Sequence, residues 1–170
     1  FISLWISFNA CYAVQMPKDE ILSEKENFRV FLKKLVKLDT EKRFYSLLWN
    51  QFSGPVRLLI INQYVFKPFW DFQRGEIKDW KKQFDQSVEE SMKYLSNQKV
   101  VDLLEVVLDR LYTLRNQLVH GGATYKSEIN RSQVIDGKNI LSMLVPLIIE
   151  IMMDSEYEDW GEIYYPVVIT

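Results

Sequence analysis

Histidine and cysteine are almost absent from this chain: its 170 residues include one of each, His120 and Cys11. A single cysteine cannot form a disulfide within the chain, which is typical of a reducing compartment such as the cytoplasm. The sequence also has no Cys/His zinc spacing, no glycine-rich phosphate loop and no Ser-His-Asp set. We therefore expect a cytoplasmic protein that uses neither a cofactor nor a metal; the alternative, a magnesium site formed by some of the 23 carboxylates, stays open.

Glycine and proline are scarce as well, with six and five residues respectively. Because these residues punctuate turns, their scarcity favours long helices over many short strands. No internal repeat, low-complexity tract or long linker divides the chain. We expect an all-α fold that forms one domain over residues 1–170.

Neither sign of charge dominates, because the chain contains 21 basic and 23 acidic residues and its net charge is −2. The protein has no global basic field, so binding to nucleic acid would need a local patch. Apolar residues make up 48% of the chain and charged residues 26%. This balance is ordinary for a globular protein that buries a substantial core.

Long hydrophobic runs are also missing. The uncharged opening Phe1–Val14 and the apolar run Leu141–Met153, interrupted by Pro146 and Glu150, are both shorter than the roughly 20 residues that span a bilayer. No basic residues precede the opening segment, so we interpret it as a fragment that starts inside a helix rather than a signal peptide. We expect no membrane partner.

The spacing of apolar residues predicts a bundle of six or seven helices. Their expected ranges are about Ile2–Gln15, Ser23–Leu38, Glu41–Phe52, Val56–Tyr64, Ile77–Ser96, Lys99–Val119 and Ser132–Met153. The helix at Lys99–Val119 is apolar over most of its circumference, so we expect it at the centre. Asp39 or Thr40 is expected to cap the third helix. Residues 67–75 read as an aromatic connector, and residues 155–170 as an extended tail packed on the bundle.

Polar residues gather where the central helix is expected to end. Arg115 and Asn116 are followed by His120, and Gly121 stands where a helix-terminating residue with positive φ is favoured. Arginine supplies a permanent, forked cation, and histidine titrates near neutral pH. These residues suit an anionic phosphate and a proton transfer, and we expect the Arg115 and His120 side chains to converge within about 4–8 Å.

The segment Arg115–His120 resembles the R-x4-6-H motif of the HEPN superfamily (higher eukaryote and prokaryote nucleotide-binding domains), including the polar residue after the arginine. Leu4–Tyr12 resembles the first-helix signature of the Apea-like branch of that superfamily. Asp159–Gly161 and Tyr165–Val168 resemble its tail. The resemblance thus touches both ends and the centre of the chain.

The resemblance implies an all-helical bundle that dimerises. In active members it implies a metal-independent endoribonuclease whose site lies across the dimer axis, often a toxin with an antitoxin partner or an antiphage effector. Other members have lost catalysis and bind RNA, nucleotides or proteins. The two function classes for this chain are therefore a ribonuclease and a non-catalytic interaction module.

The residues themselves fit metal-free RNA cleavage, in which the substrate's 2′-hydroxyl attacks the adjacent phosphorus. Arg115 would stabilise the phosphoryl oxygens and His120 would move protons. One histidine cannot serve as both base and acid at once, whereas a twofold dimer brings two copies together. Asn116 would orient His120 or bind a phosphate oxygen. The structural alternative is that Arg115 and His120 only interact with the dipole at a helix end.

Three further residues are weaker candidates for substrate binding. Asn9 would approach the phosphate if the first helix lies beside the motif, and a satisfied buried amide is the alternative for it. Lys126 and Arg131 follow the motif closely and would contact the RNA backbone.

Overall fold

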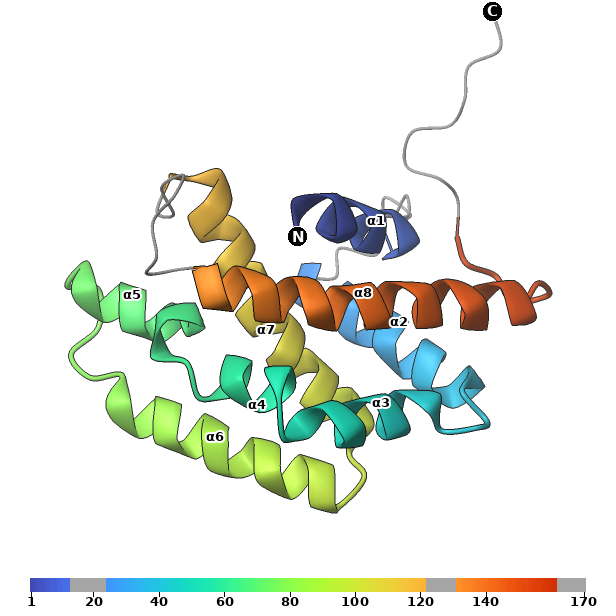
Figure 1. Ribbon diagram of the computed structural model, residues 1–170, viewed down its shortest axis with the longest axis horizontal. Helices are drawn as coiled ribbons and strands as arrows, with labels where there is room; N and C mark the ends of the chain where they lie inside the picture. The colour runs from blue at the N-terminus through green and yellow to red at the C-terminus, as the bar shows by residue number, and fades with distance from the viewer. Residues whose placement is uncertain (13–23, 122–130, 162–170) are drawn as a thin grey trace, which may run out of the picture.

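The computed structural model describes residues 1–12, 24–121 and 131–161 (Figure 1). These residues form eight α-helices and one 3-10 helix, and no strand occurs among them, which confirms the all-α prediction. In chain order the elements are α1 (Ile2–Tyr12), α2 (Glu24–Leu38), α3 (Arg43–Phe52), α4 (Pro55–Ile60), η1 (Gln63–Val65), α5 (Lys67–Gln73), α6 (Lys81–Ser96), α7 (Val100–Val119) and α8 (Arg131–Asp154).

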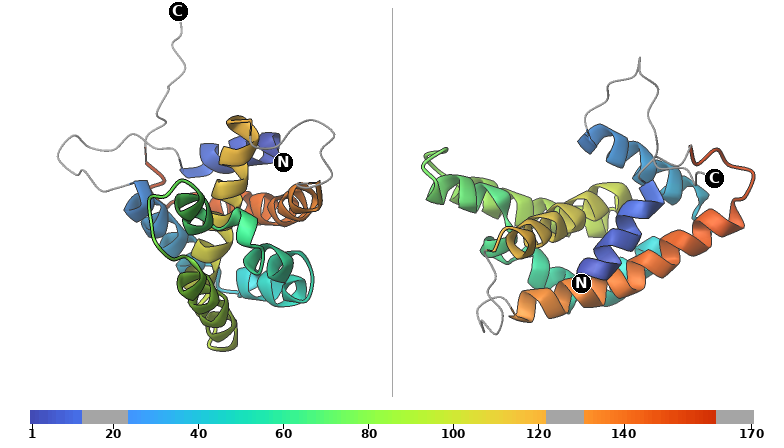
Figure 2. Two further views of the ribbon diagram at one scale, coloured as in Figure 1. Left: turned by 90° about the vertical axis from the view of Figure 1, so that its left-hand side faces the viewer. Right: turned by 90° about the horizontal axis from the view of Figure 1, so that it is seen from above.

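Helix α7 runs through the middle of the bundle, as its apolar composition predicts (Figures 1 and 2). Helices α2 and α6 pack against α7, and α1 and α4 pack against α8. Side chains of α7 such as Leu111 and Leu114 are fully buried in the common core. The last turn of α7 reaches the edge of the molecule, so the central helix carries its polar end to the surface.

Helix α8 approaches α7 and the start of the chain closely at Gly137. A Cβ atom at this glycine would lie 3.0 Å from side-chain carbons of Leu114 and Phe1 and 3.1 Å from Leu111. Those distances are tighter than ordinary packing, so a larger residue would force its neighbours apart. The absence of a side chain at Gly137 thus allows α8 to pack closely against Leu114 of α7, the residue that precedes Arg115.

The prediction of six or seven helices is wrong, because the segment interpreted as a connector folds as α5. Proline is favourable in the first turn of a helix, where its missing N–H has no intrahelical acceptor, and Pro68 occupies that position. Lys67 and Asp71, one turn apart, form an ion pair of 2.7 Å that supports the short helix. The preceding helix α4 correspondingly ends at Ile60 instead of Tyr64.

Asp39 caps the start of α3 with its side chain, which reaches backbone groups four and five residues later in the chain. Asp39 is 6% exposed, and its carboxylate accepts hydrogen bonds from the backbone N–H groups of Arg43 (2.9 Å) and Phe44 (2.8 Å). The helix begins at Arg43, two residues later than predicted, because Lys42 takes the left-handed conformation with φ 55°. The predicted capping by the Asp39 side chain is confirmed, although the N-cap position itself is Lys42 rather than Asp39 or Thr40.

The described part of the C-terminal segment returns to the bundle. The ring of Trp160 makes an edge contact with Phe31 of α2, with centroids 6.3 Å apart, and Lys34 Nζ lies 4.5 Å from the Trp160 ring centroid. The rest of the predicted extended tail, residues 162–170, lies outside the described residues. Among the described helices, none combines the length and apolar character needed to cross a bilayer.

Candidate functional site

The candidate motif, Arg115–His120, occupies the last turn of α7. The helix ends at Val119, and the backbone N–H of His120 donates to the carbonyl of Asn116 at 2.9 Å. Gly121 follows with φ +77°, which confirms the predicted left-handed residue after the helix. The His120 side chain is exposed there. The backbone geometry therefore presents the single histidine to solvent at the end of the central helix.

Arg115 is half-buried and is held by its neighbour in the sequence. Its Nη1 donates a hydrogen bond of 2.9 Å to the side-chain oxygen of Asn116. Asn116 therefore orients the arginine, whereas the sequence suggested that it would orient His120 or bind phosphate. The convergence of Arg115 and His120 stays a prediction.

Gln117 ties the motif to the rest of the fold. Its amide nitrogen donates to the backbone carbonyl of Tyr64 in η1, and its amide oxygen is buried without a hydrogen-bond partner among the described residues. The link anchors the last turn of α7 to η1. This role could not be predicted from the sequence, because no local pattern indicates which residue of the motif faces η1.

The weaker candidates have different surroundings. Asn9 accepts a hydrogen bond of 3.1 Å from the hydroxyl of Tyr12, whose ring packs on Phe28 of α2. Asn9 is half-buried and already bonded, in agreement with the alternative of a satisfied amide. Arg131 is exposed as the first residue of α8, and Lys126 lies outside the described residues. Substrate binding by these three residues stays a prediction.

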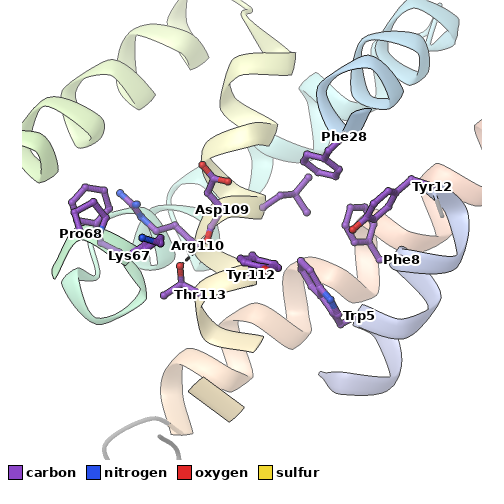
Figure 3. Close-up of a pocket in the computed structure, with 12 residues that line it drawn as sticks. Trp5, Phe8, Tyr12, Phe28, Lys67, Pro68, Asp109, Arg110, Tyr112 and Thr113 are labelled. Atoms are coloured by element: carbon purple, nitrogen blue, oxygen red, sulfur yellow. Dashed lines mark hydrogen bonds between the residues drawn. The ribbon is translucent and has the colours of Figure 1, made fainter. Parts of the chain in front are cut away.

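A cleft of about 580 Å³ opens along α7, one to two turns before the motif (Figure 3). We call it the aromatic cleft, because aromatic rings form much of its wall. Its lining residues are Trp5, Phe8, Tyr12, Phe28, Phe66, Lys67, Pro68, Leu108, Asp109, Arg110, Tyr112 and Thr113. Helices α1 and α2 supply one side, and residues of α5 and the chain just before it supply the other.

Arg110 is the most unusual side chain in the cleft, since it is charged and only 3% exposed. Its guanidinium carbon lies 4.3 Å from the ring centroid of Phe66 and 5.8 Å from that of Phe84. Its Nη2 donates to the hydroxyl of Ser87 at 3.1 Å, while its Nε is buried without a partner among the described residues. Burial lowers the pKa of Arg110 to about 10, so the group stays charged at neutral pH.

One feature of the sequence points to Arg110. This arginine interrupts the apolar positions of a helix predicted to be buried, and charged residues are rarely fully buried unless they are paired. Its two aromatic neighbours come from a segment before α5 and from α6, far away in the sequence. Their arrangement around Arg110 could be seen only in the folded chain.

Comparison of this chain with protein-family models, with curated proteins and with solved structures finds no match.

Proposed function

We propose that this protein is a metal-independent endoribonuclease of the HEPN type, a cytoplasmic toxin or antiphage effector that cleaves RNA through the substrate's own 2′-hydroxyl. The observation that carries the proposal is the end of α7. There, a half-buried Arg115 is oriented by Asn116, and an exposed His120 follows within five residues. A fixed cation, and groups that take up and release protons, are what this reaction needs from a protein.

In the proposed reaction the 2′-oxygen attacks phosphorus while a base removes the 2′-hydroxyl proton. The bond from phosphorus to the 5′-oxygen breaks, and an acid protonates that leaving oxygen. The products are a 2′,3′-cyclic phosphate and a 5′-hydroxyl end. Arg115 stabilises the charge that develops on the phosphoryl oxygens, and its planar fork suits that geometry.

Two protons move in opposite directions in this step, and the chain contains a single histidine. We therefore propose a twofold dimer in which His120 of each protomer contributes to one composite site. Two apolar side chains near the expected axis support this assembly. Ile6 of α1 is 62% exposed and Val119, beside His120, is 53% exposed. Light scattering that reports a monomer at micromolar concentration would argue against the composite site.

The deciding experiment measures RNA cleavage in EDTA for the wild type and for single variants. His120→Ala should lower the rate about 10²–10⁴-fold, the range typical of general acid–base groups. Arg115→Ala should lower it by a similar factor, and Arg115→Lys should restore part of the loss, since a point charge does not reproduce the fork. Arg57→Ala, which removes an exposed arginine from α4, serves as the matched control and should leave the rate unchanged.

If the His120→Ala and Arg115→Ala variants cleave RNA as fast as the wild type, the catalytic proposal is wrong. An interaction module that binds RNA, a nucleotide or a partner protein then takes its place. Circular dichroism of each variant separates a loss of catalysis from a loss of folding, because an intact helical bundle retains its far-ultraviolet spectrum.

A further inference from the structure

We propose that the ring of Tyr64 in η1 stacks on one unpaired base of the RNA substrate and so holds the adjacent phosphate beside His120. The substrate is therefore single-stranded RNA, because a base paired inside a duplex is not free to stack on a side chain. This role of Tyr64 rests on the proposed ribonuclease function, to which it adds the way in which the substrate is held.

The side chain of Tyr64 is a large aromatic surface open to solvent. Tyr64 is 42% exposed, although the next two residues, Val65 and Phe66, are buried. Its ring meets that of Phe69 nearly at a right angle, with centroids 5.4 Å apart, and Phe69 in turn packs on the buried Trp80 at 5.0 Å. The ring of Tyr64 is thus supported from the core side, and its exposed surface is available to a base.

The backbone of Tyr64 is held by three side chains. Its N–H group donates to the side-chain oxygen of Asn62 at 2.9 Å. Its carbonyl oxygen accepts hydrogen bonds from the indole nitrogen of Trp70, at 2.7 Å, and from the amide nitrogen of Gln117. An aromatic side chain on a backbone fixed in this way has little conformational freedom to lose on binding, so more of the stacking energy contributes to affinity.

The contact with Gln117 places Tyr64 on the His120 side of α7. Residues three apart on a helix are neighbours, with Cβ atoms roughly 5–6 Å apart, and His120 follows Gln117 by three positions at the helix end. In one direction around the helix axis, His120 lies about 60° from Gln117, and Arg115 lies about 200° from it. A strand whose base stacks on Tyr64 therefore reaches His120 before Arg115, and the phosphate next to that base can lie between them.

The charges beside Tyr64 give RNA little attraction of their own. The two cations of the neighbouring segment, Lys67 and Arg74, are both paired with Asp71, at 2.7 Å and 2.5 Å. The whole chain has a net charge of −2. A base–aromatic stack supplies affinity without any net charge and tolerates every base. Tyr64 thus offers the kind of attraction that suits a nucleic acid on a surface without a strong positive charge.

Fluorescence anisotropy with 2′-O-methyl oligonucleotides tests the stack without cleavage, because the methyl group blocks the attacking oxygen. The wild type should bind a short 2′-O-methyl oligoadenylate saturably. An abasic oligomer of the same length and charge should bind about 5–150-fold more weakly, which corresponds to the loss of one base–aromatic stack. Equal affinity for the two oligomers, or an absence of saturable binding, would overturn the proposal.

Two further probes test the choice of ligand. The oligoadenylate paired with 2′-O-methyl oligouridylate should bind no more tightly than the abasic oligomer, because its bases are not free to stack. Binding of this duplex as tightly as the single strand would overturn the choice of single-stranded RNA. Adenosine monophosphate should bind far more weakly than the oligoadenylate. Equal affinity for the two would show that the site takes a free nucleotide instead of an RNA strand.

Variants then locate the stack. Tyr64→Ala should lower the affinity for the oligoadenylate to that for the abasic oligomer, whereas Tyr64→Phe, which keeps the ring, should match the wild type. Trp49→Ala is the matched control, since Trp49 is a 54% exposed aromatic residue of α3, which lies far from α5 in Figure 1, and it should change neither affinity. Should Tyr64→Ala fail to fold, Tyr64→Leu keeps an apolar side chain and still removes the ring. Wild-type affinity in a folded Tyr64→Ala or Tyr64→Leu variant would show that Tyr64 does not stack on the base.

Cleavage kinetics separate this role of Tyr64 from the ribonuclease activity itself. Tyr64→Ala should raise KM for single-stranded RNA and leave kcat near the wild-type value, because the stack is present in both the ground state and the transition state. Base-dependent binding by a wild type that does not cleave RNA would contradict the ribonuclease and leave an RNA-binding site at Tyr64. Cleavage by a wild type that binds the abasic oligomer as tightly as the oligoadenylate would contradict the stack alone.

Discussion

Replacement of Gly121 by alanine tests how the fold presents the candidate catalytic histidine. Gly121 has φ +77°, and a Cβ atom built there meets no atom within 4 Å. The side chain of alanine therefore has room, and any destabilisation of Gly121→Ala comes from the backbone conformation alone. The chain also contains a matched control, because Gly75 has the same φ of +77° and the same open surroundings.

The expected magnitude follows from two opposing terms. The left-handed conformation costs a residue with a Cβ atom roughly 1–2 kcal/mol relative to glycine. Alanine also lowers the entropy of the unfolded chain, which returns about 0.4–1 kcal/mol. Gly121→Ala and Gly75→Ala should each lose about 1 kcal/mol of unfolding free energy, which corresponds to about 2–4 °C in Tm for a chain of this size.

Urea and thermal unfolding followed by circular dichroism measure both variants side by side. The reasoning is refuted if Gly121→Ala unfolds together with the wild type while Gly75→Ala is destabilised, because Gly121 would then not hold the left-handed conformation in solution. If both variants match the wild type, the assumed backbone penalty is wrong at open positions of this fold.

The rate of RNA cleavage should distinguish the Gly121→Ala and Gly75→Ala variants, although their unfolding free energies should be similar. If His120 acts in RNA cleavage, Gly121→Ala should slow the reaction, because a strained residue after the helix displaces the histidine that caps it. Gly75→Ala lies beyond α5 and should cleave at the wild-type rate. A loss of activity in both variants would indicate general destabilisation rather than displacement of His120.

Two further predictions concern carboxylates of the scaffold. Asp39→Ala should lower the unfolding free energy by about 2 kcal/mol in a urea titration, because the backbone N–H groups of Arg43 and Phe44 lose their acceptor. The control variant Thr40→Ala, at an exposed neighbouring position, should change the unfolding free energy little in the same titration. Burial raises the pKa of Asp136, so its charged form destabilises the fold above that raised pKa. Asp136→Asn should therefore raise Tm at neutral pH. This gain in Tm should vanish as the pH falls through the raised pKa of Asp136 to the ordinary value of 3.8. A gain in Tm that is independent of pH would contradict the argument.

The sequence predicted those features that depend on residues close together in the chain. The apolar periodicity of α7 reflects burial on nearly all sides, and the glycine after His120 reflects the conformation of one residue. Asp39 caps a helix that begins four residues later. Each of these features is determined by local geometry, and each is found in the fold.

The failures have physical causes of two kinds. The helix α5 was missed because Lys67-Pro68 was interpreted as a break, although proline also favours the first turn of a new helix. Arg110 was missed because its environment is assembled from distant segments: Phe66 precedes α5, and Phe84 belongs to α6. No local pattern could place those rings around that guanidinium.

Arg110 and Arg115 have separate surroundings on one helix. Five residues separate them, so their side chains leave α7 roughly 140° apart around its axis and about 7.5 Å apart along it. Arg110 lies between aromatic rings with one bond to Ser87, and Arg115 is held by Asn116 at the helix end. Because the two guanidiniums share no partner, their effects should be additive. Arg110→Gln should leave RNA cleavage intact, whereas Arg115→Ala should slow it. A loss of cleavage in Arg110→Gln with an unchanged far-ultraviolet spectrum would show that the two arginines act together.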